Sequence, residues 1–112
     1  MTVDVPGKSK GEETSFMVRC DGPCSGVNVF LNVSSGDPDL FALENARPSI
    51  KSGQCRECKG FCYSTKAGGM EACNNITTTA DTFVVVLYAY KSYETGTITF
   101  ENVEDAKEDD GK

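Results

Sequence analysis

The alternation of side chains over residues 27–33, VNVFLNV, most constrains what this chain can fold into. Apolar side chains recur at every second position, which is the period of a β-strand with one buried face. The positions between them are Asn28, Phe30 and Asn32. Asn32 begins the N-glycosylation sequon Asn32-Val33-Ser34, and the alternation directs its side chain away from the core. We therefore expect a half-buried strand with a glycosylation site on its outer face.

Further strands are expected where short apolar runs lie between turn residues. The predicted strands are 15–19, 27–33, 40–43, 61–64, 81–91 and 96–100. Residues 34–38 have the composition of a loop, and 92–95 that of a turn joining the last two strands as a hairpin. Both faces of 81–91 are apolar, which indicates a central strand. Short strands separated by turns, with no helical period beyond two turns, predict an all-β sandwich.

The chain has the length of one domain, which we place at residues 14–103. Residues 1–13 have the composition of a linker, and 104–112 that of an acidic tail or linker. The start of the chain lacks the apolar segment of a signal peptide, so the chain is expected to be either cytosolic or a piece of a longer secreted protein. The cysteines and the two sequons favour the second interpretation.

The cysteines lie at positions Cys20, Cys24, Cys55, Cys58, Cys62 and Cys73. Sequence alone does not choose among the possible connectivities, and local pairing is favoured. The expected disulfides are Cys20–Cys24, Cys55–Cys58 and Cys62–Cys73. Two alternatives are a zinc site built from the last four thiolates and a CxxC redox centre. The single CxxC and the absence of histidine disfavour the zinc site. The redox centre is disfavoured because thioredoxin-type sites open a helix after a strand, and the sequence around this CxxC predicts no such context.

Charge and sequons narrow the possible partners and the compartment. The net charge of −6 disfavours nucleic acid and membrane surfaces as partners. No apolar run approaches the length of a membrane-spanning helix. Cysteines in even number and the sequons at Asn32 and Asn75 predict an extracellular or secretory-lumen location.

Catalytic chemistry is not expected in this chain. Without histidine, the triads that use an imidazole base are excluded. Asp37 and Asp39 stand two residues apart in a loop that contains Gly36, which places both carboxylates on one side of an extended chain, and hard oxygen ligands of this kind suit calcium. The alternative is a plain turn in which both aspartates bond backbone amides.

Two segments resemble the bacterial-type pre-peptidase C-terminal domain, over about residues 14–103. They are 35–41, SGDPDLF, and 82–90, TFVVVLYAY. The resemblance implies a jelly-roll-like antiparallel sandwich of about eight strands, found as a non-catalytic part of secreted proteins. Related collagenase collagen-binding domains bind calcium through an acidic loop and fibrils through tyrosines. Asp39 matches the acidic position and Tyr88 and Tyr90 the aromatic strand, whereas the cysteine-rich insertion 55–73 departs from the family.

The function expected from these features is a non-catalytic extracellular module that mediates protein or glycan binding within a larger secreted or membrane-anchored protein. Tyr88, Tyr90 and Tyr93 are the candidate contact residues, because tyrosine combines a large area with a polar tip. The alternative is that they pack within the sheets. Besides an outside protein or glycan, neighbouring domains of the same chain are expected partners. Two other functions stay open: a stand-alone cysteine-stabilised effector or protease inhibitor, and a folding or secretion aid for a neighbouring enzyme.

Overall fold

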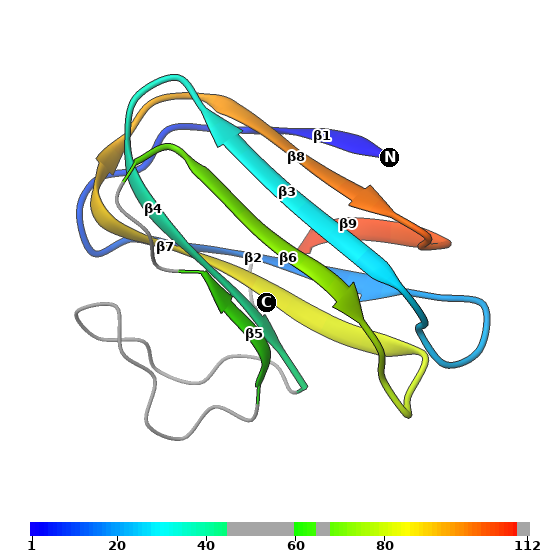
Figure 1. Ribbon diagram of the computed structural model, residues 1–112. Coiled ribbons are helices and arrows are strands. Elements are labelled where there is room, and N and C mark those ends of the chain that lie inside the picture. Colours follow the sequence, from blue (N-terminus) through cyan, green and yellow to red (C-terminus); the bar gives the residue numbers. More distant parts are fainter. Residues whose placement is uncertain (45–59, 65–67, 110–112) are drawn as a thin grey trace.

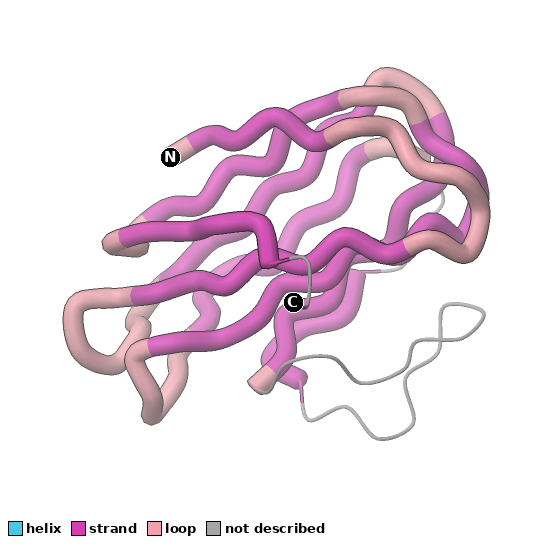
Figure 2. The backbone as a smooth tube through the Cα atoms, turned by 180° about the vertical axis from the view of Figure 1, so that it is seen from behind, coloured by secondary structure: helices cyan, strands magenta, loops and turns pink. Residues whose placement is uncertain are grey.

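Two antiparallel β-sheets face each other in the computed structural model, which describes residues 1–44, 60–64 and 68–109. Figure 1 shows the two layers, and Figure 2 shows the same sandwich from behind. The described residues contain no helix. The all-β sandwich predicted from the sequence is therefore confirmed.

Nine strands among the described residues build the two sheets. The four-stranded sheet contains, in spatial order, β1 (Thr2–Val5), β8 (Gly96–Glu101), β3 (Val27–Val33) and β6 (Met70–Ile76). The five-stranded sheet contains β5 (Gly60–Ser64), β4 (Gly36–Leu43), β7 (Thr82–Tyr93), β2 (Glu13–Arg19) and β9 (Asp105–Asp109).

Strand pairing follows the nested pattern of a jelly roll. β1 pairs with β8, β2 with β7, β3 with β6, and β4 with β5, all antiparallel. The contacts between β3 and β8 and between β4 and β7 join these pairs into two sheets. β9 adds a ninth strand on the other edge of β2. The jelly-roll architecture implied by the resemblance is confirmed, with one additional strand.

The core lies between the sheets and is built from alternate positions of each strand. The inward positions of β3 are buried, whereas Phe30 and Asn32 are exposed, as the alternation over 27–33 predicts. The rings of Phe16 on β2 and Phe100 on β8 meet across the sandwich, with centroids 5.8 Å apart. Contacts of this kind join the two sheets through apolar side chains.

β7 is the central strand of the five-stranded sheet and is buried on both faces along most of its length. One face contributes to the core, through Phe83, Val85, Leu87 and Ala89. The other face joins β4 in a second apolar cluster, formed by Phe41, Leu43, Val84, Val86 and Tyr88. The central position predicted for residues 81–91 is confirmed.

Residues 2–5 and 105–109 form strands of the two sheets, which corrects the predicted linker, tail and domain bounds of 14–103 over these residues. β1 lies in the predicted linker and pairs with β8, and its Val5 is buried. β9 lies in the predicted tail and pairs with β2, and its Ala106 is buried. Each of these strands has one fully buried side chain among its described positions, so the sequence carries little apolar pattern there.

The predicted hairpin between 81–91 and 96–100 is wrong. β7 and β8 lie in different sheets, and residues 94–95 carry the chain from one sheet to the other. Each strand finds its partners elsewhere: β7 pairs with β2 and β4, and β8 with β1 and β3. Alternation and turn residues predict that two strands exist, but they do not tell which sheet each strand joins.

The predicted loop at 34–38 is also corrected, because β4 already begins at Gly36. Gly36 has a φ of 108°, which favours glycine. A Cβ atom at this position would overlap the backbone of Ser92 and Tyr93. Glycine therefore lets the start of β4 lie against the end of β7, and the residues that follow it continue as a strand.

Replacing Ala106 by aspartate tests whether the C-terminal segment is part of the fold. Ala106 is 2% exposed, so Ala106→Asp buries an unpaired carboxylate and is expected to lower the free energy of unfolding by about 3 kcal/mol. Lys107 is the matched control, because its side chain is 80% exposed and Lys107→Asp should cost less than about 1 kcal/mol. Urea unfolding measures both. Equal, small effects would mean that this segment is a solvated tail.

Candidate functional site

Three carboxylates meet where β4 and β6 approach each other. Asp37 and Asp39 lie on β4, Glu71 lies on β6, and one oxygen from each lies within 4.8 Å of the others. The sequence predicts the two aspartates together and misses Glu71, because this residue falls in the cysteine-rich insertion 55–73, where no strand is predicted around it. A signal for it exists: Glu71 stands two residues before Cys73, which places both on one face of a strand.

The arrangement of strands explains why these residues come together. β4 pairs with β5 over Leu40–Leu43, so among the described residues its first half pairs only with β7. β6 belongs to the other sheet, yet it contacts both β4 and β5. The Cys62–Cys73 disulfide joins β5 to β6 with a Cα–Cα distance of 5.8 Å. This crosslink fixes β6 beside β5, whose partner residues on β4, Leu40–Leu43, directly follow Asp39.

The electrostatics of the cluster are unfavourable for three negatively charged carboxylates. Asp39 and Glu71 are each 3% exposed. Burial, and then the negative charges of Asp37 and Glu71, raise the pKa of Asp39 to about 6. Asp37 Oδ1 is also buried and accepts no hydrogen bond from the described residues. Buried like charges at this spacing raise the energy of the fold unless a proton or a cation neutralises them.

The geometry of the cluster fits one calcium ion. Calcium binds oxygens at about 2.3–2.6 Å, so two ligands of the same ion lie at most about 5 Å apart. The carboxylate separations fall within that span. Carboxylates are ligands that calcium prefers, and the three residues come from strands of both sheets. The alternative prediction of a plain turn at 36–39 is wrong, since these residues form the start of β4.

The three tyrosines proposed as contact residues occupy different environments. Tyr90 on β7 is 46% exposed and offers its ring to solvent. Tyr88 is 8% exposed and Tyr93 is 4% exposed, so neither presents a contact surface. Tyr88 packs in the second apolar cluster, and burial raises the pKa of the Tyr93 phenol, which keeps it neutral. The prediction is corrected for these two residues, and Tyr90 remains the candidate.

The two sequons lie on the surface. Asn32 is exposed near the end of β3, and Asn75 is exposed at the end of β6. Asn75 has a φ of 57°, and its backbone N–H donates a hydrogen bond to Asn28 Oδ1 at 2.9 Å. Both side chains are therefore accessible to a glycan, as the sequence predicted for Asn32.

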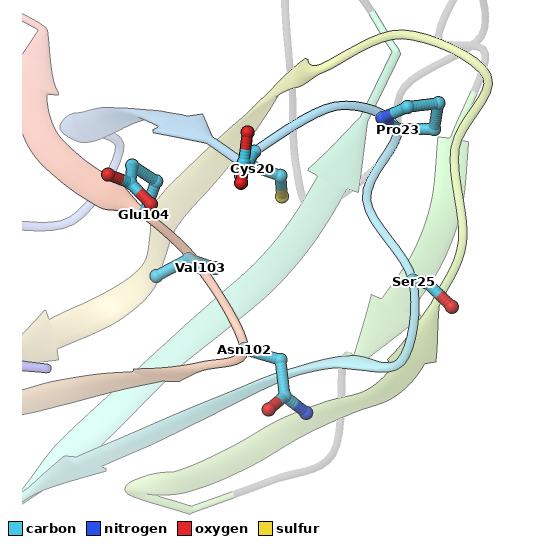
Figure 3. Close-up of a pocket in the computed structure, with 7 residues that line it drawn as sticks. Cys20, Pro23, Ser25, Asn102, Val103 and Glu104 are labelled. Atoms are coloured by element: carbon cyan, nitrogen blue, oxygen red, sulfur yellow. The ribbon is translucent and has the colours of Figure 1, made fainter.

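A shallow depression of about 340 Å³ lies between the β2–β3 and β8–β9 connections (Figure 3). Its lining residues are Cys20, Asp21, Pro23, Ser25, Asn102, Val103 and Glu104. The depression is open to solvent, and its two carboxylates, Asp21 and Glu104, are exposed. Ligand sites are typically more enclosed and more apolar than this. It therefore lacks the features of a binding pocket.

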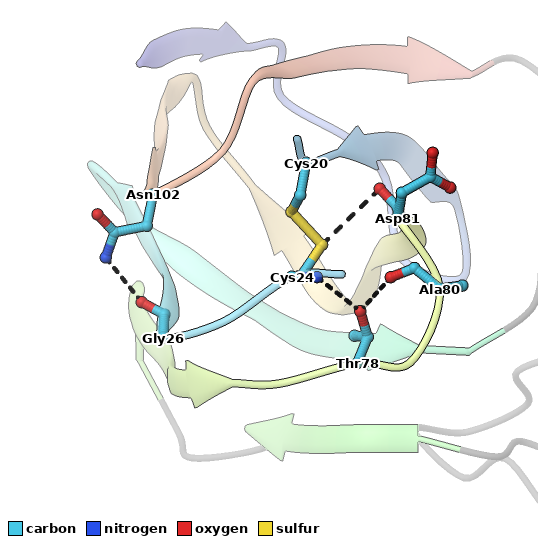
Figure 4. Close-up of a disulfide and its surroundings, with 7 residues drawn as sticks. All are labelled: Cys20, Cys24, Gly26, Thr78, Ala80, Asp81 and Asn102. Atoms are coloured by element: carbon cyan, nitrogen blue, oxygen red, sulfur yellow. Dashed lines mark hydrogen bonds between the residues drawn. A yellow bond between two sulfur atoms is a disulfide. The ribbon is translucent and has the colours of Figure 1, made fainter. Parts of the chain in front are cut away.

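The Cys20–Cys24 disulfide crosslinks the loop at this end of the molecule (Figure 4). The backbone N–H of Cys24 donates to Thr78 Oγ1 at 3.2 Å, and this hydroxyl donates to the carbonyl of Ala80. Asn102 Nδ2 donates to the carbonyl of Gly26 at 2.8 Å. These bonds tie the connections between strands together, which is a structural role.

Two of the three expected disulfides are confirmed, Cys20–Cys24 and Cys62–Cys73. Cys55 and Cys58 lie outside the described residues. The alternative zinc site is wrong, because two of its four proposed thiolates, Cys62 and Cys73, are joined to each other.

Stability in EDTA is expected to fall as the pH rises from about 4 to about 7. The pKa of an aspartate in the unfolded chain is about 3.9, and that of Asp39 in the folded chain is about 6. The folded state therefore binds this proton more tightly than the unfolded state does. The stability that the proton contributes is complete below the pKa of the unfolded chain, and it is lost as the pH rises through the pKa of the folded chain. Asp39 alone should lower the free energy of unfolding by about 2 kcal/mol across this range.

Urea unfolding at several pH values, with EDTA present, measures this effect. Asp39→Asn should flatten the decline, because the amide does not titrate. Asp4→Asn changes an exposed carboxylate on β1 and should leave the decline unchanged. If the free energy of unfolding of the wild type changed with pH as little as that of Asp39→Asn, the pKa of Asp39 would not be raised in the folded chain.

Comparison with protein families and known proteins found no relative of this chain. No protein-family model matches the chain, and no curated protein or solved structure shows significant similarity to it. In the part of the chain that the structure describes, no helix is long and apolar enough to cross a membrane.

Proposed function

We propose that this chain is a non-catalytic extracellular binding module, with a calcium ion held by Asp37, Asp39 and Glu71. The observation that carries the proposal is the meeting of three carboxylates from two sheets within 4.8 Å, two of them almost fully buried. A divalent cation would neutralise the charge and join β4 to β6. Its role there is structural, because it would fix the two strands relative to each other.

The kind of ligand in the cluster favours calcium over transition metals. All three donors are carboxylates, the hard ligands that calcium and magnesium prefer. Zinc is usually bound through cysteine or histidine, and the chain has no histidine. Calcium accepts irregular geometry and larger ligand numbers than magnesium, which suits ligands from two separate strands.

Three features favour an extracellular location. Two disulfides hold the fold together, and structural disulfides persist in oxidising compartments. Both sequons are exposed, so a glycan fits at each of them without disturbing the core. The surface is acidic overall, with a net charge of −6, which disfavours binding to anionic membranes or nucleic acid.

Tyr90 is the residue through which we propose that the module contacts its partner, an extracellular protein or glycan. It lies on β7 in the segment that pairs with the first residues of β4, since Lys91 is opposite Asp37 and Ala89 is opposite Pro38. The register shifts in this region, which marks it as irregular. An ion on the β4 aspartates would order the strand pair that presents Tyr90. Calcium binding and partner binding would then be coupled.

Calcium is expected to raise the midpoint of thermal unfolding by several degrees. At about 100 times its dissociation constant, a ligand that binds only the folded state adds about 2.7 kcal/mol of stability. Asp39→Asn should abolish this rise while raising the midpoint in EDTA at pH 7.5, because it removes a buried charge. Asp4→Asn is the control and should respond as the wild type does.

Differential scanning calorimetry in EDTA and in millimolar calcium measures these midpoints. Asp39→Asn is expected to have a higher midpoint than the wild type in EDTA and to lose the rise that calcium causes. General damage to the fold would instead lower the midpoint in both buffers. Coincident curves for the wild type with and without calcium would contradict the proposed ion site.

Binding of the domain to an extracellular partner is expected to depend on Tyr90. The probes are immobilised fibrillar collagen and an array of purified glycans, each tested in calcium and in EDTA. Tyr90→Ala should weaken binding about tenfold or more, as is usual for an aromatic residue that carries a contact. Met17→Ala changes another exposed apolar residue of the same sheet and should not weaken it. Equal binding by Tyr90→Ala and the wild type would place the contact elsewhere.

A further inference from the structure

The outer face of the four-stranded sheet carries an exposed aromatic side chain beside a sequon. Phe30 is 39% exposed and Asn32 is exposed, and both lie on β3. They are two positions apart on a regular strand, so their side chains leave the same face of the sheet. Leu31, between them, is buried in the core, which fixes this orientation.

Strand pairing places a second exposed apolar side chain next to Asn32. Met70 on β6 lies opposite Asn32 and is 72% exposed. On the other side, β8 places Thr97 opposite Asn32 and Thr99 opposite Phe30. Both threonines are small and partly exposed. Phe30 and Met70, which we call the outer apolar pair, therefore flank Asn32 with no bulky side chain on the β8 side.

The spacing suits a sugar attached to Asn32. Same-face neighbours along a strand are about 6.8 Å apart, and the first sugar of an N-glycan extends from Asn32 Nδ2 by about the width of its own ring. A sugar ring directed back along the strand would lie over the ring of Phe30. The C–H groups on one face of N-acetylglucosamine carry partial positive charge, and the face of an aromatic ring carries partial negative charge. The two surfaces are complementary in shape and in charge.

We propose that Asn32 carries an N-glycan whose first N-acetylglucosamine packs on the ring of Phe30, covers the outer apolar pair and stabilises the sheet. In the transfer, a bond forms between Asn32 Nδ2 and C1 of the sugar, and the bond from C1 to the diphosphate of a lipid-linked oligosaccharide breaks. The lipid diphosphate leaves, and the amide gives up one proton. The inference rests on the extracellular location proposed above, because the modification requires the secretory pathway.

The second sequon provides an internal contrast. The residue two positions before Asn75 is Cys73, which is buried and bonded to Cys62. Asn75 also has a positive φ, so its side chain does not follow the regular alternation of β6. A glycan on Asn75 therefore has no aromatic ring at the equivalent position. Only the glycan on Asn32 should change the stability of the fold through packing.

The test uses the full chain with Asn75→Gln, secreted from a eukaryotic host and trimmed by an endoglycosidase that leaves one N-acetylglucosamine. Peptide mass spectrometry establishes occupancy of Asn32. Thermal midpoints are measured in EDTA for four proteins. Two of them keep Phe30 and two carry Phe30→Thr, and within each pair one protein bears the single sugar on Asn32 and the other carries Asn32→Gln. We expect the sugar to raise the midpoint by about 3 °C with Phe30 and by less than about 1 °C with Phe30→Thr.

Two controls keep the result specific. Met17→Thr replaces an exposed apolar side chain of the other sheet, and the full rise should persist. Nuclear Overhauser contacts between the sugar and the Phe30 ring should be present in the single-sugar protein. An equal rise with Phe30 and with Phe30→Thr would overturn the packing, and an unmodified Asn32 in the secreted protein would overturn the site itself.

The outcome is independent of the proposed ion site. Calcium should raise the midpoint of Asn32→Gln as much as that of the wild type, because Asn32 is not a ligand. A calcium response without sugar packing would leave the proposed function standing and remove this inference. Sugar packing without a calcium response would support this inference and contradict the proposed ion site.

Discussion

The apolar layer between the two sheets is the constraint on which the rest of this structure depends. Every core strand contributes alternate side chains to it, and the ring contact between Phe16 and Phe100 spans it. In the part of the chain that the structure describes, buried apolar side chains make up this layer. The candidate sites described above lie at the edges, the ends and the outer faces of the sandwich. The acidic cluster, Tyr90 and Asn32 all lie outside the apolar interior.

Among the described residues, the acidic cluster is where charged side chains are buried at the junction of the sheets. Two aspartates in β4 follow a glycine that brings the strand against β7, and Glu71 reaches them from β6. The Cys62–Cys73 disulfide holds β6 close to β5, so the carboxylates cannot separate simply by a movement of one sheet. Burying like charges close together in a crosslinked scaffold costs free energy, which a bound cation would offset. This explains how a metal would strengthen the fold without taking part in its core.

The sequence predicted those parts of the fold in which one face of a strand is strongly apolar. Residues 27–33 match β3 at both ends, and the long run at 81–91 overlaps β7 over residues 82–91. β6 was missed because its pattern, MEACNNI, buries a glutamate and a disulfide cysteine where an apolar residue would be expected. Glu71 was missed with it. β1 and β9 were missed because their places in the sheets depend on backbone pairing, which leaves little trace in the side chains.

The tyrosines show a different limit of sequence analysis. Alternation along 82–93 separates two faces, but it does not tell whether the outer face is covered. Tyr88 and Tyr90 are on the same side by period, yet one is buried and the other is half-exposed. Tyr88 lies opposite Asp39, where β4 is still regularly paired, whereas Tyr90 lies where the register between β4 and β7 shifts.

If a glycan on Asn32 covers the outer apolar pair, the outer face of the four-stranded sheet is closed to a partner. The open contact surface then lies on the five-stranded sheet, at the end where Tyr90 and the β4 aspartates are neighbours. Ion binding and partner contact would therefore share one end of the molecule, and the glycan would direct the partner to it.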